Sequence, residues 1–195
     1  MELLVVVSLI AILAALVLAA AGGILKKIKR DQIRAFMAEI ETGLEDFKVD
    51  NAIYPMNPKT TGGTFSDATA IEGSAVLYDS LSGDTDKDGT VNDDATVYVE
   101  RLDWWSNSGG TTGKAPETRR SVPSPSGTGY IIVDPLGSPM RYIAAAYGTS
   151  QDHQKEREKL KQRNPTFDLW SVAGAAGNPP DFSDESTWIT NWGSN

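Results

Sequence analysis

The sequence predicts an α+β fold in which a long N-terminal α-helix packs against a small antiparallel β-sheet with long loops. The run from Leu3 to Leu25 is apolar, and residues 2–54 contain no proline that would interrupt a helix. Beyond Pro55 the chain is rich in Gly, Thr, Ser, Asp and Pro and has only short apolar runs. The chain has 195 residues, of which 40% are hydrophobic and 23% charged. This is enough for one globular domain and a long accessory element.

The first element, residues 1–25, is predicted to be a helix that can cross a membrane. Its only hydroxyl group between Leu3 and Leu25 belongs to Ser8, and it carries no charge there. At 1.5 Å per residue this helix would be on the order of 35 Å long, which matches the hydrocarbon core of a bilayer. We therefore expect a single-pass segment that is buried either in lipid or among identical neighbours.

A cleaved secretory signal peptide is the alternative interpretation of this run. The small residues of 18–22 resemble a cleavage site, but an acidic residue, Glu2, stands where a signal peptide would carry basic charge. Sequencing the N-terminus of the mature protein would separate the two interpretations.

The second element, residues 26–54, is predicted to be an amphipathic helix that continues the first. A basic cluster opens it, and apolar residues then recur at steps of three and four: Ile33, Phe36, Met37, Ile40, Leu44 and Phe47. Together the two halves would form one helix on the order of 70 Å long. Its apolar stripe is expected to pack on the rest of the subunit.

The third element, residues 55–195, is predicted to be a loop-rich globular β domain. Short apolar runs at 75–78 and 96–99 indicate strands, and the runs 130–133 and 140–143 indicate a hairpin around the turn-forming residues between them. A small antiparallel sheet packed on the helix stripe follows from these runs.

Five blocks of the chain resemble type IV pilins and, more closely, the major pseudopilin of type II secretion. The apolar block 2–14 resembles the start of these proteins, and the later blocks are 43–55, 134–142, 167–171 and 189–192. They occur in the family's order. The resemblance implies a structural subunit of a helical filament, either a periplasmic secretion pseudopilus or a surface pilus.

The resemblance also implies partners, location and an assembly site. The partners would be further copies of the chain, minor pilins or pseudopilins, and the inner-membrane assembly machinery. The subunit would wait in the inner membrane and then form a periplasmic or cell-surface filament. Glu2 would pair with the N-terminal amine of a neighbouring subunit, and the family methylates that amine. The implied assembly residues are therefore Glu2 and Met1.

Elementary electrostatics supports a special role for Glu2. A carboxylate at the edge of an apolar helix costs several kcal/mol to desolvate unless a cation meets it. An ion pair of this kind can set the register of neighbouring helices. The alternative is a glutamate exposed at the level of the lipid headgroups.

An acidic loop is the sharpest chemical signal in the globular half. Carboxylates at alternate positions followed by Gly89 can converge several oxygens on one hard cation, as calcium loops do. The candidate ligands are Asp84, Asp86, Asp88, Asn92, Asp93 and Asp94. Because the twelfth loop position is Ala95, we expect Asp93 or Asp94 to supply the late ligand. The alternative is an acidic, solvated turn.

A second candidate calcium loop lies where the related pseudopilins bind calcium. Its candidate ligands are Asp181, Ser183, Asp184 and Glu185. The chain has no cysteine, so metal coordination is the remaining way to hold long loops closed.

The composition excludes several other functions. A formal net charge of -8 argues against nucleic-acid binding. The single histidine, His153, lies in a polar run, and no nucleophile has a recognisable base beside it, so we expect neither catalytic residues nor enzymatic activity. A membrane-anchored or signal-peptide-bearing extracytoplasmic calcium-dependent binding protein is the alternative to a filament subunit.

Two further features allow two interpretations each. Trp104 and Trp105 are expected in the core or in a subunit contact, with a sugar-binding platform as the alternative. The charged helical run 155–163 is expected to be a solvated face, with salt bridges between protomers as the alternative.

Overall fold

The fold is α+β, as the sequence predicts. A computed structural model describes residues 2–57, 66–102, 120–145, 151–172 and 185–193, and it does not describe the side chains of residues 2–4, 16–26 and 153. The helices are α1 (Glu2–Asn51), α2 (Asp67–Leu81), η1 (Glu100–Leu102), α4 (Gln151–Leu160) and η2 (Glu185–Thr187). The strands are β1 (Ser121–Pro123), β2 (Tyr130–Ile132), β3 (Arg141–Ile143), β4 (Asp168–Ser171) and β5 (Ile189–Thr190).

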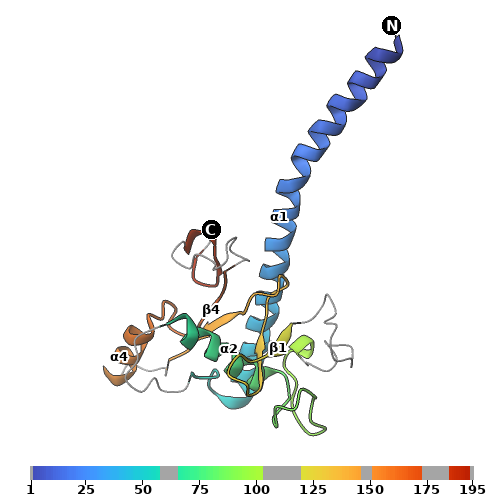
Figure 1. Ribbon diagram of the computed structural model, residues 1–195. Coiled ribbons are helices and arrows are strands. Elements are labelled where there is room, and N and C mark those ends of the chain that lie inside the picture. The colour runs from blue at the N-terminus through green and yellow to red at the C-terminus, as the bar shows by residue number, and fades with distance from the viewer. Residues whose placement is uncertain (1, 58–65, 103–119, 146–150, 173–184, 194–195) are drawn as a thin grey trace.

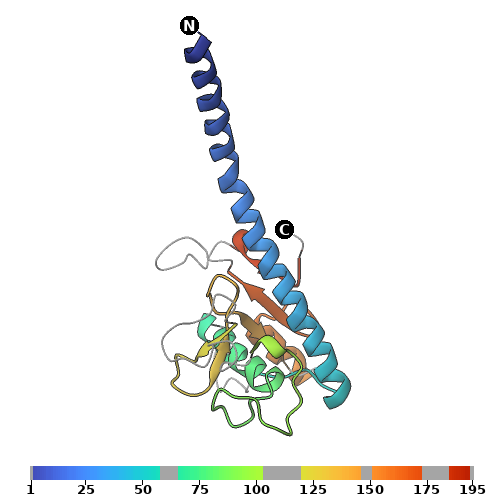
Figure 2. The same ribbon diagram turned by 90° about the vertical axis from the view of Figure 1, so that its right-hand side faces the viewer.

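Helix α1 is one continuous helix of 50 residues. Its C-terminal part lies along the globular domain, whereas its N-terminal part projects well beyond it (Figures 1 and 2). The predicted apolar stripe is the face that packs on the domain, with Ile33, Ile40 and Leu44 fully buried. The helix ends three residues before the predicted end because Ala52 adopts a left-handed conformation with φ of 62°.

Helix α2 corrects the predicted strand at 75–78. Ser66 caps its N-terminus by accepting a hydrogen bond from the backbone N–H of Thr69. The predicted strand rested on the four residues 75–78, whereas the buried residues of α2 recur with a helical period from 70 to 81. They are Ala70, Gly73, Ser74, Leu77, Tyr78 and Leu81. That longer period favours helix over strand.

The predicted strand at 96–99 is also wrong. The backbone N–H groups of Tyr98 and Val99 both donate to the carbonyl of Leu81, at 3.0 Å each. This segment therefore closes on the C-terminal end of α2, and no strand is assigned to it. Its apolar residues serve the core instead, since Val99 is buried in the main cluster.

Two small antiparallel sheets are present where the sequence predicts one, a two-stranded sheet and a three-stranded sheet. β1 pairs with β2, and β3, β4 and β5 pair in that order. A bridge between Val133 and Pro139 joins the two groups around the turn at 134–138. The predicted hairpin therefore turns where expected, but β2 forms its ladder with β1. This bridge and the bond from Met140 N–H to Ile132 O connect β2 to the segment that leads into β3.

Helix α2 packs on β2 of the two-stranded sheet and on β3 of the three-stranded sheet. The Ser74 hydroxyl donates to the carbonyl of Ile132, whose N–H donates back to the Ser74 oxygen at 2.9 Å. The buried guanidinium of Arg141 binds both carboxylate oxygens of Asp67 at the start of α2. These contacts fix the position from which the chain leaves α2 into the acidic loop.

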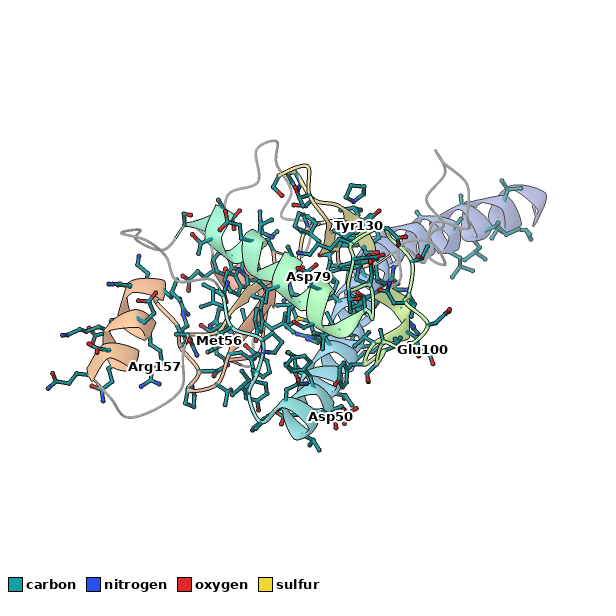
Figure 3. The ribbon with its side chains drawn as sticks, turned by 90° about the horizontal axis from the view of Figure 1, so that it is seen from below. Asp50, Met56, Asp79, Glu100, Tyr130 and Arg157 are labelled. Atoms are coloured by element: carbon teal, nitrogen blue, oxygen red, sulfur yellow. The ribbon has the colours of Figure 1, made fainter. Side chains whose placement is uncertain are left out.

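Helix α4 is a charged helix at the edge of the domain, far from α1 (Figures 1 and 3). It covers 151–160, whereas the charged run predicts helix over 155–163, and it ends where Lys161 adopts φ of 53°. Leu160 is its anchor, because it is 2% exposed and packs in a second core cluster with Trp170.

Candidate functional site

The N-terminal part of α1 carries large apolar side chains with no covering partner in the described structure. Their exposed fractions lie between 54% and 62%: Val5, Val6, Val7, Leu9, Ile10, Ile12 and Leu13. Burying one such side chain contributes about 1.5–3 kcal/mol, so a continuous exposed run of them marks an interaction surface.

Glu2, the predicted assembly residue, begins α1, but its side chain is outside the described part. Met1 lies outside the described residues altogether. Within the described part of the chain, the helices do not include one that is both long enough and apolar enough for a membrane span.

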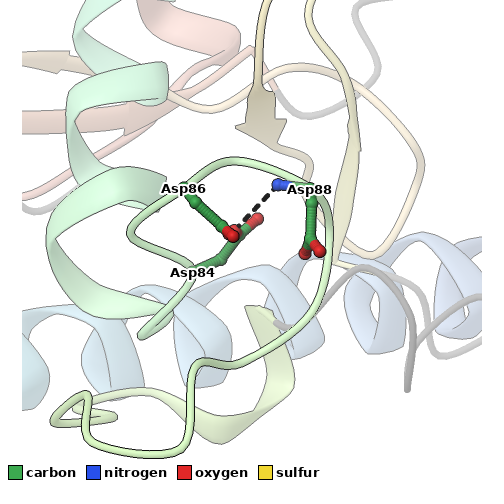
Figure 4. A group of neighbouring side chains, drawn as sticks. All are labelled: Asp84, Asp86 and Asp88. Atoms are coloured by element: carbon green, nitrogen blue, oxygen red, sulfur yellow. Dashed lines mark hydrogen bonds between the residues drawn. The ribbon is translucent and has the colours of Figure 1, made fainter.

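The acidic loop after α2 brings three of its predicted ligands together. One carboxylate oxygen from each of Asp84, Asp86 and Asp88 lies within 4.8 Å of the others (Figure 4). Hard divalent cations such as Ca²⁺ prefer oxygen ligands in this kind of cluster. Among the described residues, this cluster is a candidate metal centre.

The local backbone explains why these carboxylates converge. Gly83, Lys87 and Gly89 have positive φ values of 78°, 63° and 92°, so the chain turns back on itself within seven residues. The N–H groups of Asp88 and Gly89 then donate to the carboxylate of Asp84, at 3.1 and 2.9 Å. Asp84 is thereby the centre around which the loop is folded.

Asp84 is fully buried, so its carboxylate is the most strongly desolvated of the three in the cluster. Burial raises the pKa of its carboxyl, although the hydroxyl of Tyr78 and the loop N–H groups donate to it and oppose the shift. The pKa of Asp88 is lowered, because the hydroxyl and N–H of Thr90 donate to its carboxylate. A cation at the cluster would offset the desolvation of Asp84.

Of the other three predicted ligands of this loop, Asp93 and Asp94 do not belong to the group of three carboxylates, and Asn92 makes hydrogen bonds within the loop. The side-chain oxygen of Asn92 accepts hydrogen bonds from the N–H and hydroxyl of Thr85, so it fastens the loop instead. Asp93 and Asp94 are exposed and stand apart from the three carboxylates.

Sequence reasoning missed two residues that support the loop. Tyr78 donates to Asp84 at 2.9 Å from the preceding helix, and Tyr130 donates to the carbonyl of Asp88 at 3.3 Å from β2. The two tyrosine rings also contact each other, with centroids 5.1 Å apart. The helical period of α2 could have placed Tyr78 near the loop, but nothing in the sequence pairs Tyr130 with it.

The second candidate loop lies mostly outside the described residues, as do Asp181, Ser183 and Asp184. Its remaining member, Glu185, opens η2 and forms an ion pair with Arg163 at 2.5 Å. Trp104 and Trp105 also lie outside the described residues.

Comparison with models of known families, with curated proteins and with solved structures gives no significant match for this chain.

Proposed function

We propose that the chain is a structural subunit of a helical filament of the type IV pilin and type II secretion pseudopilin class. The observation that supports this proposal is the difference in burial between the two halves of α1. Its C-terminal half buries Ile33, Ile40 and Leu44 in the domain, while apolar side chains from Val5 to Leu13 stay exposed. A helix of this kind needs a second apolar environment that the subunit itself does not supply.

In the proposed function α1 exchanges one apolar environment for another. Before assembly, residues 1–25 lie in the inner membrane; after assembly they pack in a central bundle of identical helices. Head-to-tail contacts between identical subunits generate an open helical filament. Minor pilins or pseudopilins and the inner-membrane machinery are the proposed partners. The C-terminal blocks favour a periplasmic secretion pseudopilus over a surface pilus, by analogy alone.

Electron micrographs of material sheared from cells that express the full chain test this proposal. We expect filaments of uniform diameter that contain the chain with residues 1–25 retained. Dispersed subunits only, or mature protein that starts beyond residue 25, would contradict it.

An extracytoplasmic calcium-dependent binding protein, anchored by residues 1–25 or released from a signal peptide, is the second candidate. The carboxylate cluster of Asp84, Asp86 and Asp88 favours it. If the chain is such a binding protein, we expect monomers that stay dispersed in detergent at all calcium concentrations. If it is a filament subunit, we expect assembly.

We also propose that Ca²⁺ binds the cluster and stabilises the subunit. The loop joins α2, through Tyr78, to β2, through Tyr130, so a cation there would hold two parts of the domain together. A ligand that binds only the folded form stabilises it by mass action, by about 2.7 kcal/mol at a hundredfold excess over its Kd.

We expect that chelating calcium lowers the melting temperature of the full chain in detergent by roughly 5–10 °C, since 1 kcal/mol corresponds to about 2–4 °C in a domain of this size. Differential scanning calorimetry with calcium and with chelator measures this shift. Asp86→Asn should remove most of it, because Asp86 belongs to the cluster. Asp94→Asn is the matched control and should keep it. An unchanged melt, or equal loss in both variants, would contradict the proposed ligands.

A further inference from the structure

Helix α1 carries two neighbouring segments of opposite charge. We define the basic segment as residues 26–34, which contain five basic side chains and one acidic, and the acidic segment as residues 39–50, which contain five acidic side chains and one basic. The basic residues are Lys26, Lys27, Lys29, Arg30 and Arg34, and the acidic residues are Glu39, Glu41, Glu45, Asp46 and Asp50. One continuous helix therefore carries formal charges of +4 and -4 side by side.

The basic segment keeps most of its charge. Its one acidic residue, Asp31, pairs with Arg34 at 3.2 Å. Arg30 donates to a backbone carbonyl, that of Thr187, at 3.1 Å, which leaves the charge of its guanidinium in place. Lys27 is exposed and forms no ion pair with any residue that the structure describes. Lys27 is thus a cation that a neighbouring molecule can reach.

The acidic segment has fewer cations than carboxylates. Arg101 pairs with Glu39 at 3.5 Å, and Lys48 lies 3.8 Å from Glu45. Glu41 forms no ion pair within the described residues, and burial, together with the nearby Glu45, raises the pKa of its carboxyl. A groove of about 580 Å³ lies beside Glu41 and Glu45. A cation from outside the subunit would stabilise this pair of carboxylates.

Lys27, Glu41 and Glu45 lie on the same side of α1. A helix turns by about 100° per residue, so Glu45 is about five full turns from Lys27, and Glu41 lies within about 40° of the same line. Their distances from Lys27 along the axis are about 27 and 21 Å, so the three charges of one copy cannot meet. Ala38 and Thr42 are exposed on the stretch between them, and small side chains allow another helix to approach closely.

These positions distinguish two ways of placing a second copy alongside the first. Two parallel helices in register would set Lys27 beside Lys27 and Glu45 beside Glu45, which is unfavourable. A shift of about 21–27 Å along the axis instead sets Lys27 of one copy beside Glu41 and Glu45 of the other. Because the shifted contact joins two different surfaces, it can repeat from copy to copy as an open helix.

We propose that neighbouring α1 helices in the filament are parallel and shifted by about 21–27 Å, with Lys27 of one copy in contact with Glu41 and Glu45 of the other. This inference rests on the proposed filament function and specifies the axial shift between its subunits. Single exposed ion pairs contribute little, but like charges placed opposite each other are strongly unfavourable. The charge pattern therefore selects the shifted arrangement over the unshifted one.

Disulfide cross-linking in filaments of the full-length chain tests the shift, because the chain has no cysteine of its own. Ile28→Cys with Thr42→Cys leaves the three charges intact and places two thiols about 21 Å apart in one copy. A disulfide needs Cα atoms roughly 4.4–6.8 Å apart, so only a neighbour can supply the partner. We expect a ladder of covalent multimers on a denaturing gel. Ile28→Cys with Ala35→Cys, about 10 Å apart, and each single cysteine variant are the controls and should give no ladder.

Charge reversal in the same cysteine variant tests the cause of the shift. Lys27→Glu should reduce the cross-linked fraction about tenfold, because it sets three carboxylates together. Adding Glu41→Lys should restore the fraction to within about threefold of the starting value. Glu45→Lys provides a second, independent rescue. Lys155→Glu makes the same charge change on the exposed surface of α4 and should leave the ladder unchanged.

Each outcome supports or overturns the contact. Filaments that cross-link through Ala35, or through one cysteine alone, would overturn the shift. A ladder that Lys27→Glu leaves intact, or that neither rescue restores while the melting temperatures stay equal, would overturn the role of charge. If the unaltered chain forms no filaments at all, the proposed function fails instead, so the two failures are distinguishable.

Discussion

Replacing Glu2 by leucine is expected to abolish filament formation while the globular domain stays folded. In the proposed assembly the Glu2 carboxylate moves with an apolar helix into a bundle of identical helices, where it needs a cation to offset its desolvation. The N-terminal amine of a neighbour is the cation that the resemblance supplies. Leucine removes the ion pair that sets the register of neighbouring helices, although it makes the helix more apolar.

Sheared filaments counted by electron microscopy, together with the melting temperature of the same variant, measure this expectation. Asp46→Ala is the matched control, because Asp46 is an exposed carboxylate on the same helix that lies on the globular half. Glu2→Gln should resemble Glu2→Leu, since an amide cannot replace the charge. Normal filaments from either Glu2 variant would show that hydrophobic packing alone sets the register.

The long helix was predictable because its signal repeats over many residues. The stripe from Ile33 to Leu44 samples several helical turns, so chance agreement is small, and all its predicted positions in this range are buried. Only the end was misplaced. A left-handed Ala52 ends the helix, and this conformation is uncommon enough for alanine that sequence patterns give little warning of it.

The short elements were less predictable because four residues fit either period. The run at 75–78 belongs to α2, whose cap at Ser66 and buried positions at Ala70 and Ser74 lie outside the run. The run at 96–99 is apolar because Val99 is needed in the core, not because it pairs in a sheet. In both cases tertiary packing, which the run alone does not reveal, decided the local structure.

The candidate metal site was predictable in part for a related reason. The alternate spacing of Asp84, Asp86 and Asp88 brings them together through local turns, and local turns are encoded nearby. Asn92 has a side-chain oxygen of the kind that binds calcium, but in this structure that oxygen accepts hydrogen bonds from the N–H and hydroxyl of Thr85. Competition among hydrogen-bond partners within a loop depends on the three-dimensional path, which spacing does not fix.

Replacing Gly73 by alanine is expected to destabilise the domain severely. Gly73 lies where α2 packs against β3, and an added Cβ would overlap the backbone carbonyl oxygen of Tyr142 and lie 2.6 Å from Nδ2 of Asn57. The carbonyl cannot move aside easily, because Asn57 donates to it and the Tyr142 hydroxyl is bonded to the carbonyl of Pro55 at 2.7 Å. Helix α2 would have to shift away from the sheet.

We expect Gly73→Ala to lower the free energy of unfolding by at least about 3 kcal/mol, and the melting temperature by roughly 10 °C, because overpacking against rigid backbone cannot relax. Two other glycines give a graded comparison. At Gly43 the added Cβ would meet mainly a methyl group of Val99, which can rotate, so a smaller loss is expected. At Gly193 no heavy atom of the described residues, apart from its chain neighbours, lies within 4 Å of the added Cβ, so Gly193→Ala should leave the melt unchanged. Equal melting temperatures for Gly73→Ala and Gly193→Ala would show that α2 does not sit on β3 as closely as the structure places it.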